Sequence, residues 1–364
     1  MAKNMVFFLG AGFTKAVAPN APNGRQFFEK GFSPDNQLLE IDQIRKLKEF
    51  VETVYYPLTD EGILPRIEDV MSLVDYCVQQ KQGLNQSFGY DEILDARDSI
   101  VFLMRKLIQE SVEMHSNYEL ADNFVHHLNH SDLNATVATT NYDIVIDNAL
   151  LRRAGSCNYG IRLRSSNNVQ SGVRPLPLLD RNQGPLNRGK IPLLKIHGSL
   201  NWLWCPKCDE IDLVWGEKAT IEDASRQFCA NEYCTENYQP LLITPTMFKA
   251  YDGRHLRKLL QLFQEAIEGA TDLVFIGYSF PDADYLVRSV LTRGLSRNSR
   301  ASKVRVVVVD NVVDHDPKAP THIADLQARY SSVFGNRVLL ETIGLSGFVE
   351  RFDEVMDKAE SSMK

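Results

Sequence analysis

The residues with the clearest capacity for chemistry each follow a short apolar run. His197 ends the run that begins at Leu193, and Asn141 and Asp143 follow the run at 135–138. The run at 5–9 leads into a glycine-rich turn made of Gly10, Ala11, Gly12, Phe13 and Thr14. Such runs are typical of buried parallel strands, and in open α/β sheets ligands gather beyond the carboxyl ends of the strands. We therefore expect the turn, the Asn/Asp pair and the histidine to meet around one ligand.

Each of these residues can serve either a ligand or the fold alone. An imidazole with a pKa near neutral can act as a general base, which is the chemistry expected of His197. Asn141 and Asp143 can contact a ligand, but residues of these types at a strand end also form turns and cap helices, here the helix expected at 144–151. A glycine-rich turn before a helix can accept a phosphate group, although many α/β folds carry such a turn for structural reasons.

Four of the six cysteines are paired by their spacing. Two residues separate Cys205 from Cys208, and four separate Cys229 from Cys234. Two such pairs in one segment can close a tetrahedral zinc site that holds together a small module without its own core. Four thiolate ligands leave no open coordination position, so we expect a structural metal; the alternative is four reduced thiols in a loop. Cys77 is isolated, as is Cys157, and both are predicted to be ordinary thiols.

The elements that must position these residues alternate between strands and helices. Further strands are expected at 241–244, 272–276, 304–309 and 337–342, with helices at 256–267 and 347–358. Right-handed βαβ connections should join the strands into one parallel sheet. Gly277 and Ser279 follow the strand at 272–276. Asp310 ends the strand at 304–309, a point where an acidic residue often binds a ribose.

The middle of the chain has a different pattern of apolar residues. Strand signals are missing from about 34 to 130, and apolar residues between Ile93 and Val112 recur at spacings of three and four, which predicts a long amphipathic helix. We interpret 34–130 as a helical insertion and 204–239 as a zinc-binding module. The ranges 1–33, 131–203 and 240–364 then form one domain. The predicted fold class is α/β, a Rossmann-like parallel sheet with helices on both faces, plus the insertion and the zinc module.

The composition excludes several classes of protein. A chain of 364 residues with 44% hydrophobic content can bury a large core. A formal net charge of -7 argues against a dedicated nucleic-acid binder, which usually presents a basic face. No apolar stretch approaches the roughly 20 residues needed to span a bilayer, and no secretory signal follows Lys3. We expect a soluble cytoplasmic protein with no direct nucleic-acid or membrane contact.

The order of these motifs resembles the sirtuin (Sir2) superfamily and, within it, the bacterial SIR2-like proteins of antiphage defence. The resemblance covers residues 1–32 and about 131–345. It implies that the predicted domain binds NAD, with His197 as general base at the nicotinamide ribose, Asn141 and Asp143 positioning NAD, and the turn at 10–14 holding the pyrophosphate. It further implies that Gly277, Ser279 and Asp310 hold the adenosine half.

Two departures from the sirtuin pattern bear on the reaction. Deacylating sirtuins carry a GIPDFR-like stretch where this chain has APNGRQ at 21–26, and a VVxFGE-like strand that pairs with the acyl-lysine peptide where this chain has TPTMFK at 244–249. Strand addition is how that motif would hold a peptide. Without it, water is the expected acceptor. The sequence therefore predicts an NAD+ hydrolase (NADase) that yields nicotinamide and ADP-ribose.

The resemblance also implies a biological setting. SIR2-like defence proteins deplete NAD+ when a partner senses phage, so we expect a homo-oligomer regulated by a separate sensor or ATPase, of the HerA type or an Argonaute. Two other functions stay open: an NAD-dependent protein deacylase and a non-catalytic nucleotide-binding scaffold. The presence of both His197 and Asn141 argues against the scaffold.

Overall fold

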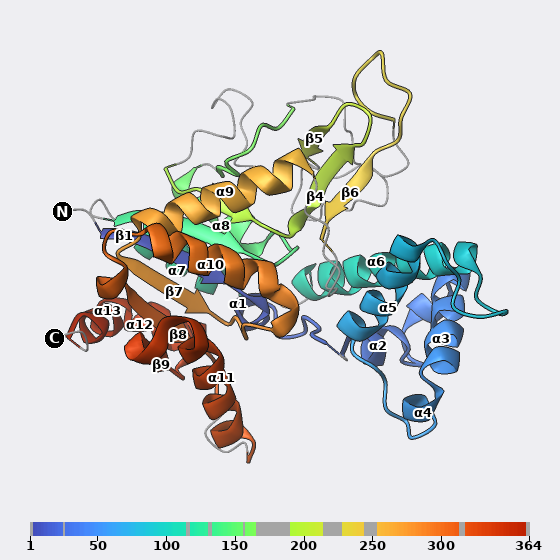
Figure 1. The fold of residues 1–364 in the computed structure, drawn as a ribbon, viewed down its shortest axis with the longest axis horizontal. Helices are drawn as coiled ribbons and strands as arrows, with labels where there is room; N and C mark the ends of the chain where they lie inside the picture. Colours follow the sequence, from blue (N-terminus) through green and yellow to red (C-terminus); the bar gives the residue numbers. More distant parts are fainter. Residues whose placement is uncertain are drawn as a thin grey trace. The chain divides into compact units, whose positions relative to one another are not determined.

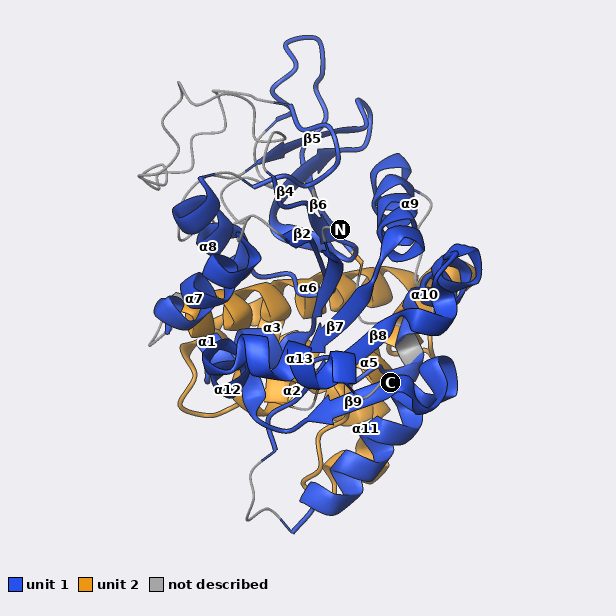
Figure 2. Ribbon diagram, turned by 90° about the vertical axis from the view of Figure 1, so that its left-hand side faces the viewer, with its two compact units in different colours: residues 1–19, 116–242, 252–364 blue, residues 20–115, 243–251 orange. Residues whose placement is uncertain are grey.

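The computed structural model describes residues 3–24, 26–113, 117–129, 133–155, 157–164, 190–213, 228–243, 253–312 and 317–361. The segment 244–249, which bears on the acyl-lysine question, lies outside these ranges. The chain divides into two compact units (Figure 2). Unit 1 comprises 1–19, 116–242 and 252–364, and unit 2 comprises 20–115 and 243–251.

Unit 1 is built on a six-stranded sheet in which every neighbouring pair of strands is parallel (Figure 1). In sheet order the strands are β3 (Leu193–Lys195), β2 (Leu133–Thr139), β1 (Lys3–Leu9), β7 (Asp272–Ile276), β8 (Arg305–Val309) and β9 (Val338–Glu341). The chain builds outward from β1 on one side and from β7 on the other. The point where ligands bind in doubly wound sheets therefore lies beyond the ends of β1 and β7. This confirms the predicted fold class.

Helices cover both faces of this sheet because its central strand is apolar on both sides. Phe7 and Phe8 of β1 point to opposite faces. The Phe7 ring lies 5.6 Å from Phe124 of α7 (Tyr118–Leu128), and the Phe8 ring lies 5.5 Å from Phe263 of α9 (Arg254–Gly269). Other helices of the unit are α1 (Ala11–Val17), α8 (Val145–Ala154), α10 (Tyr285–Arg297), α11 (Ala319–Phe334), α12 (Gly344–Glu350) and α13 (Phe352–Ser361).

A second, antiparallel sheet in unit 1 follows His197 directly. Its order is β5 (Glu210–Leu213), β4 (Gly198–Cys205) and β6 (Gln239–Leu242). We expected the strand at 241–244 to join the parallel sheet. This prediction was wrong about the sheet, since the run belongs to β6 of the antiparallel sheet. A short apolar run does not reveal its partner strand, and here β4 is the neighbour.

Unit 2 is helical in the part that the structure describes. Its helices are α2 (Gln26–Gly31), α3 (Asp42–Val54), α4 (Tyr56–Thr59), α5 (Ile67–Gln80) and α6 (Tyr90–Glu113). The long helix α6 corresponds to the amphipathic pattern at 93–112, and residues such as Ile100 and Leu103 on its apolar side are fully buried. Among the helices in the described ranges, none is both long enough and apolar enough to cross a bilayer.

Candidate active site and metal centre

The glycine-rich turn after β1 packs against the end of β7, backbone to backbone. The amide of Gly10 donates to Ile276 O (3.0 Å), and the amide of Gly12 donates to Gly277 O (2.8 Å). A Cβ on Gly12 would lie 2.6 Å from Gly277 Cα, which is closer than real contacts allow. The glycines therefore have a structural task, joining the two strands at the switch point, while Ala11 and Gly12 stay exposed at the same edge.

Asn141 is held over this turn by side-chain hydrogen bonds. Its Nδ2 donates to Gly10 O (2.8 Å) and to Thr14 Oγ1 (2.9 Å), and its amide donates to Thr139 Oγ1 (2.9 Å). Both protons of Nδ2 are thus used, so Oδ1 is the atom of this half-buried side chain that a ligand hydroxyl can reach as a donor.

Asp143 completes this cluster through both oxygens of its carboxylate. Its Oδ2 accepts from Thr14 Oγ1 (2.6 Å), and its Oδ1 accepts from the amide of Val145, the first residue of α8 (3.0 Å). Burial raises the pKa of the Asp143 carboxyl, against the opposing charge of Lys195 and the hydrogen bond from Thr14. The predicted meeting of the glycine-rich turn with the Asn/Asp pair is therefore present.

A buried polar network supports the segment that carries Asn141 and Asp143. Lys195, which is fully buried, donates from Nζ to Asp143 O and to Asp147 Oδ2 (2.9 Å). Tyr159 donates to Asp147 Oδ1 (2.6 Å). Burial and the Asp147 charge raise the pKa of Tyr159 well above its usual range, so the phenol keeps its proton. The end of β3 and helix α8 are thereby joined by an ion pair.

His197 lies at the carboxyl end of β3 and is buried. Its Nε2 is 3.6 Å from Oδ1 of Asp284, which is also buried, and its ring centroid is 6.3 Å from that of Tyr142. The next residue, Gly198, has φ of +82°, and a Cβ there would lie 1.9 Å from Leu241 O. A side chain at this turn would be strained and would clash with the backbone, so glycine is strongly favoured there; the turn leads directly into β4.

Two of the remaining predicted residues, Ser279 and Asp310, lie along the same carboxyl edge but contact α11. Ser279 O accepts from Arg329 Nη1 (3.0 Å), and Asp310 Oδ2 lies 2.6 Å from His322 Nε2. Gly277 is part of the turn contact with Gly12. The structure therefore brings Gly10, Thr14, Asn141 and Asp143 into one hydrogen-bonded cluster, with His197 beside Asp284 and with Ser279 and Asp310 beside α11.

Sequence reasoning missed three residues of this edge. The first is Lys195, inside the apolar run at 193–196. It could have been found from the sequence, because a charge in a buried strand needs a partner. Asp147 lies on a helix and carries no local sign of that pairing. Asp284 stands in the sequence PDAD at 281–284, which reads as an ordinary turn.

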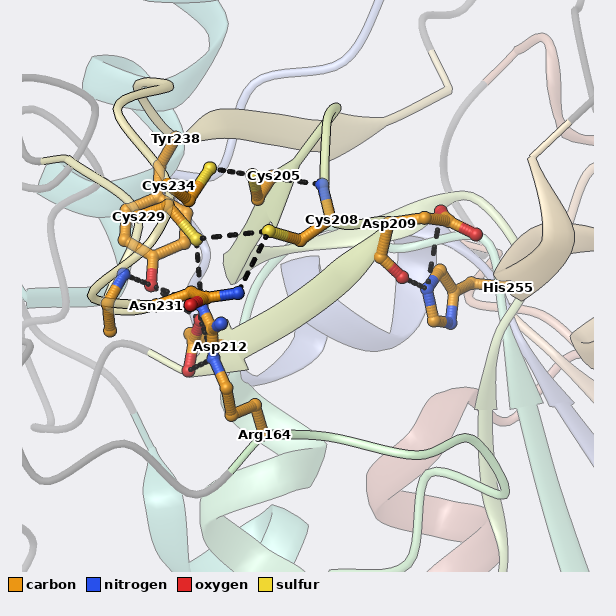
Figure 3. Close-up of polar contacts among 11 residues, drawn as sticks. Arg164, Cys205, Cys208, Asp209, Asp212, Cys229, Asn231, Cys234, Tyr238 and His255 are labelled. Atoms are coloured by element: carbon orange, nitrogen blue, oxygen red, sulfur yellow. Dashed lines mark hydrogen bonds and ion pairs between the residues drawn. The ribbon is translucent and has the colours of Figure 1, made fainter.

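The four paired cysteines meet as predicted (Figure 3). Their sulfur atoms all lie within 4.8 Å of one another, with Cys205 Sγ 3.7 Å from Cys234 Sγ and Cys229 Sγ 3.8 Å from Cys208 Sγ. Thiolates at about 2.3 Å from a tetrahedral zinc ion would have their sulfurs about 3.8 Å apart. The cluster therefore fits zinc in a closed, structural site.

Arg164 connects this cluster to a buried carboxylate (Figure 3). Its Nη2 donates to Cys229 Sγ (3.1 Å), and its Nε donates to Asp212 Oδ2 (3.1 Å), which is fully buried in β5. Burial opposes ionisation of Cys229, but hydrogen bonds from Arg164 and from the amide of Asn231 outweigh it and lower the pKa of Cys229 to about 7. Such a thiol is a ready zinc ligand, because zinc binds thiolates.

Comparison with known proteins gives a family and distant structural likenesses. The family described as "SIR2-like domain" matches residues 135–331, more than half of the chain. Solved structures with a similar fold include a Sir2 mutant with a p53 peptide and NAD, at 12% identity and a TM-score of 0.41, covering 98% of this chain and 94% of that chain. Another is Sir2 bound to acetylated peptide, at 10% identity and 0.40, with the same coverage. No curated protein matches the chain significantly. The family match, not these likenesses, carries the assignment.

Proposed function

Because the chain belongs to the SIR2-like domain family, we propose that it cleaves NAD+ between nicotinamide and ribose, with water as the acceptor. The observation that supports this most directly is the placing of a buried histidine beyond β3 and of Asn141 beyond β2, on the carboxyl edge that carries the glycine-rich turn. The choice of water over a peptide rests on the sequence TPTMFK at 244–249, which lacks the pattern of an acyl-lysine-binding strand.

The reaction breaks the C1′–N bond, and its electron pair leaves with nicotinamide, which becomes neutral. Water forms the new bond to C1′ and gives up one proton. In this proposal His197 accepts a proton, either from that water or from a ribose hydroxyl. Asn141 orients the ribose or the water through Oδ1, because both Nδ2 protons are held by Gly10 O and Thr14 Oγ1.

The other predicted residues bind NAD+ or hold the site in place and take no part in the bond-breaking step. In the proposal Asp143 fixes the segment carrying Asn141, the turn at 10–14 lies against the pyrophosphate, and Gly277, Ser279 and Asp310 receive the adenosine half. Zinc held by Cys205, Cys208, Cys229 and Cys234 would supply structure and no open coordination position.

The resemblance to SIR2-like defence proteins supports a wider proposal. The chain would act in the cytoplasm as a homo-oligomer, deplete NAD+ during phage infection, and be regulated by a separate sensor or ATPase of the HerA type or an Argonaute.

The test is NAD+ consumption by the purified full chain without added peptide, with the products separated by chromatography. Nicotinamide and ADP-ribose are expected in equal amounts. We expect turnover to fall at least about 100-fold in His197→Ala and in Asn141→Ala. His126→Ala is the matched control, because His126 is an exposed residue on α7 and should leave turnover unchanged.

Two outcomes would contradict the proposal. Turnover only with an acetylated peptide, with the acyl group transferred to the product, would identify a deacylase. Binding of NAD+ without turnover, even with candidate partner proteins added, would identify a scaffold.

A further inference from the structure

Asp284 directs its carboxylate at the predicted general base. Its Oδ1 lies 3.6 Å from His197 Nε2, and its Oδ2 accepts a hydrogen bond from Tyr278 OH (2.8 Å). Asp284 and His197 are 6% and 4% exposed, so water screens the pair little. A contact of 3.6 Å is longer than a hydrogen bond, but catalytic hydrogen bonds are often long before substrate binds.

The alternative role for Asp284 is that of a helix cap, and the structure disfavours it. Asp284 occupies the N-cap position of α10, where aspartate is common because its side chain accepts from backbone amides. Here the side chain makes no capping hydrogen bond. Its two oxygens are directed instead at Tyr278 and His197.

The segment between β7 and α10 holds Asp284 firmly in this place. Phe280 adopts a left-handed backbone conformation (φ +52°), which is unfavourable for a phenylalanine unless its surroundings enforce it. Its ring stacks on Tyr330 of α11 at 5.0 Å, and the guanidinium of Arg288 lies over it at 4.8 Å. Tyr330 also donates to Tyr278 O (2.7 Å). The chain is thereby turned back toward the histidine.

We propose that Asp284 is a positioning residue for His197, an inference that rests on the proposed NAD+ hydrolysis. Its carboxylate accepts the proton of Nε2, which leaves the lone pair of the imidazole on Nδ1 as the base. When Nδ1 takes a proton from the attacking water or a ribose hydroxyl, the carboxylate stabilises the resulting imidazolium. Tyr278, through its hydroxyl, fixes the carboxylate in turn.

The test compares two aspartates that are two residues apart. Asp284→Asn removes the charge facing His197. Asp282→Asn removes the charge of a side chain that is 90% exposed. We expect Asp284→Asn to lower kcat for NAD+ about 100-fold, with KM within about twofold of the wild type. Asp282→Asn should match the wild type. Tyr278→Phe should lower kcat by about tenfold, because the carboxylate remains but loses one anchor.

A second readout does not depend on turnover. Nitrogen NMR of the full chain with 15N-labelled histidine reports which ring nitrogen carries the proton, and His197→Ala assigns the signal. The wild type should show the Nε2–H form, and Asp284→Asn should lose that preference. If Asp284→Asn does not fold, Asp284→Glu takes its place; it should fold, retain the Nε2–H form and keep more than a tenth of wild-type kcat.

The outcomes separate this inference from the proposed function. An active wild type with unchanged kcat and an unchanged tautomer in Asp284→Asn would overturn the positioning role and leave hydrolysis intact. A wild type without turnover under any condition would remove the proposed function, and the tautomer would still decide whether Asp284 controls His197.

Discussion

Gly198 shows how one residue fixes the place of the predicted general base. A side chain there meets two obstacles, a left-handed backbone (φ +82°) and Leu241 O at 1.9 Å from the added Cβ. We expect Gly198→Ala to destabilise the protein by about 2–4 kcal/mol, measured by urea denaturation. NAD+ turnover should fall as well, because His197 is the preceding residue.

The control is Gly269→Ala, near the end of α9, where the added Cβ has nothing closer than 4.0 Å. Alanine is the better helix former, so this variant should be as stable as the wild type or more so. A Gly198→Ala protein with the wild-type denaturation midpoint would show that the turn can relax and that glycine is not required.

Residue types could be predicted from the sequence, but their partners could not. The strand-end rule was enough to expect Thr14, Asn141 and Asp143 near one another, since all three follow β1 or β2. Asp284 reaches His197 only because the segment after β7 turns back, and that turn depends on ring contacts with α11. No local pattern around Asp284 carries this information.

At the scale of elements, a buried ion pair between Lys195 and Asp147 links β3 to α8. Removing the lysine leaves a buried carboxylate without its counter-charge, and we expect Lys195→Met to cost about 3–5 kcal/mol of stability. Adding Asp147→Asn should recover much of that loss, because an amide carries no charge and can still accept from Tyr159. Urea denaturation of the single and double variants measures this.

The matched control is the exposed pair between Lys46 and Asp42 on α3 (3.0 Å). Lys46→Met should leave the denaturation midpoint unchanged, because exposed ion pairs contribute little. If Lys195→Met also left the denaturation midpoint unchanged, the ion pair would not contribute to holding β3 and α8 together.

Apolar runs identified the strands of the parallel sheet, because strands buried on both faces are almost continuously apolar. The same signal misplaced the run at 241–244. Its neighbour β4 lies just beyond His197, and the antiparallel pairing of β4 with β6 connects segments that the cysteine cluster draws together. Pairing of that kind joins segments that lie far apart in the sequence, so a short apolar run does not predict it.

At the scale of the whole molecule, one strand joins the cysteine cluster to the predicted active site. β4 begins at Gly198, directly after His197, and ends at Cys205, a predicted zinc ligand. His255 at the start of α9 also reaches this region, donating from Nε2 to Asp209 O (2.7 Å) just after Cys208 (Figure 3). Loss of the metal should therefore displace His197 without unfolding the parallel sheet.

We expect about one zinc ion per chain by elemental analysis, and expect Cys229→Ser to lose it. After chelation, hydrogen exchange should quicken in β4, β5 and β6 and stay slow in β1, β2, β7 and β8, whose core is built from buried aromatic and branched side chains. NAD+ turnover should fall in parallel, and zinc should restore it. Cys77→Ser is the control, because Cys77 lies on α5 in unit 2. The Cys77→Ser protein should keep the metal. Slow exchange in β4 to β6 of the zinc-free protein would mean that the small sheet is stable by itself, and that its cysteines contribute nothing to the placing of His197.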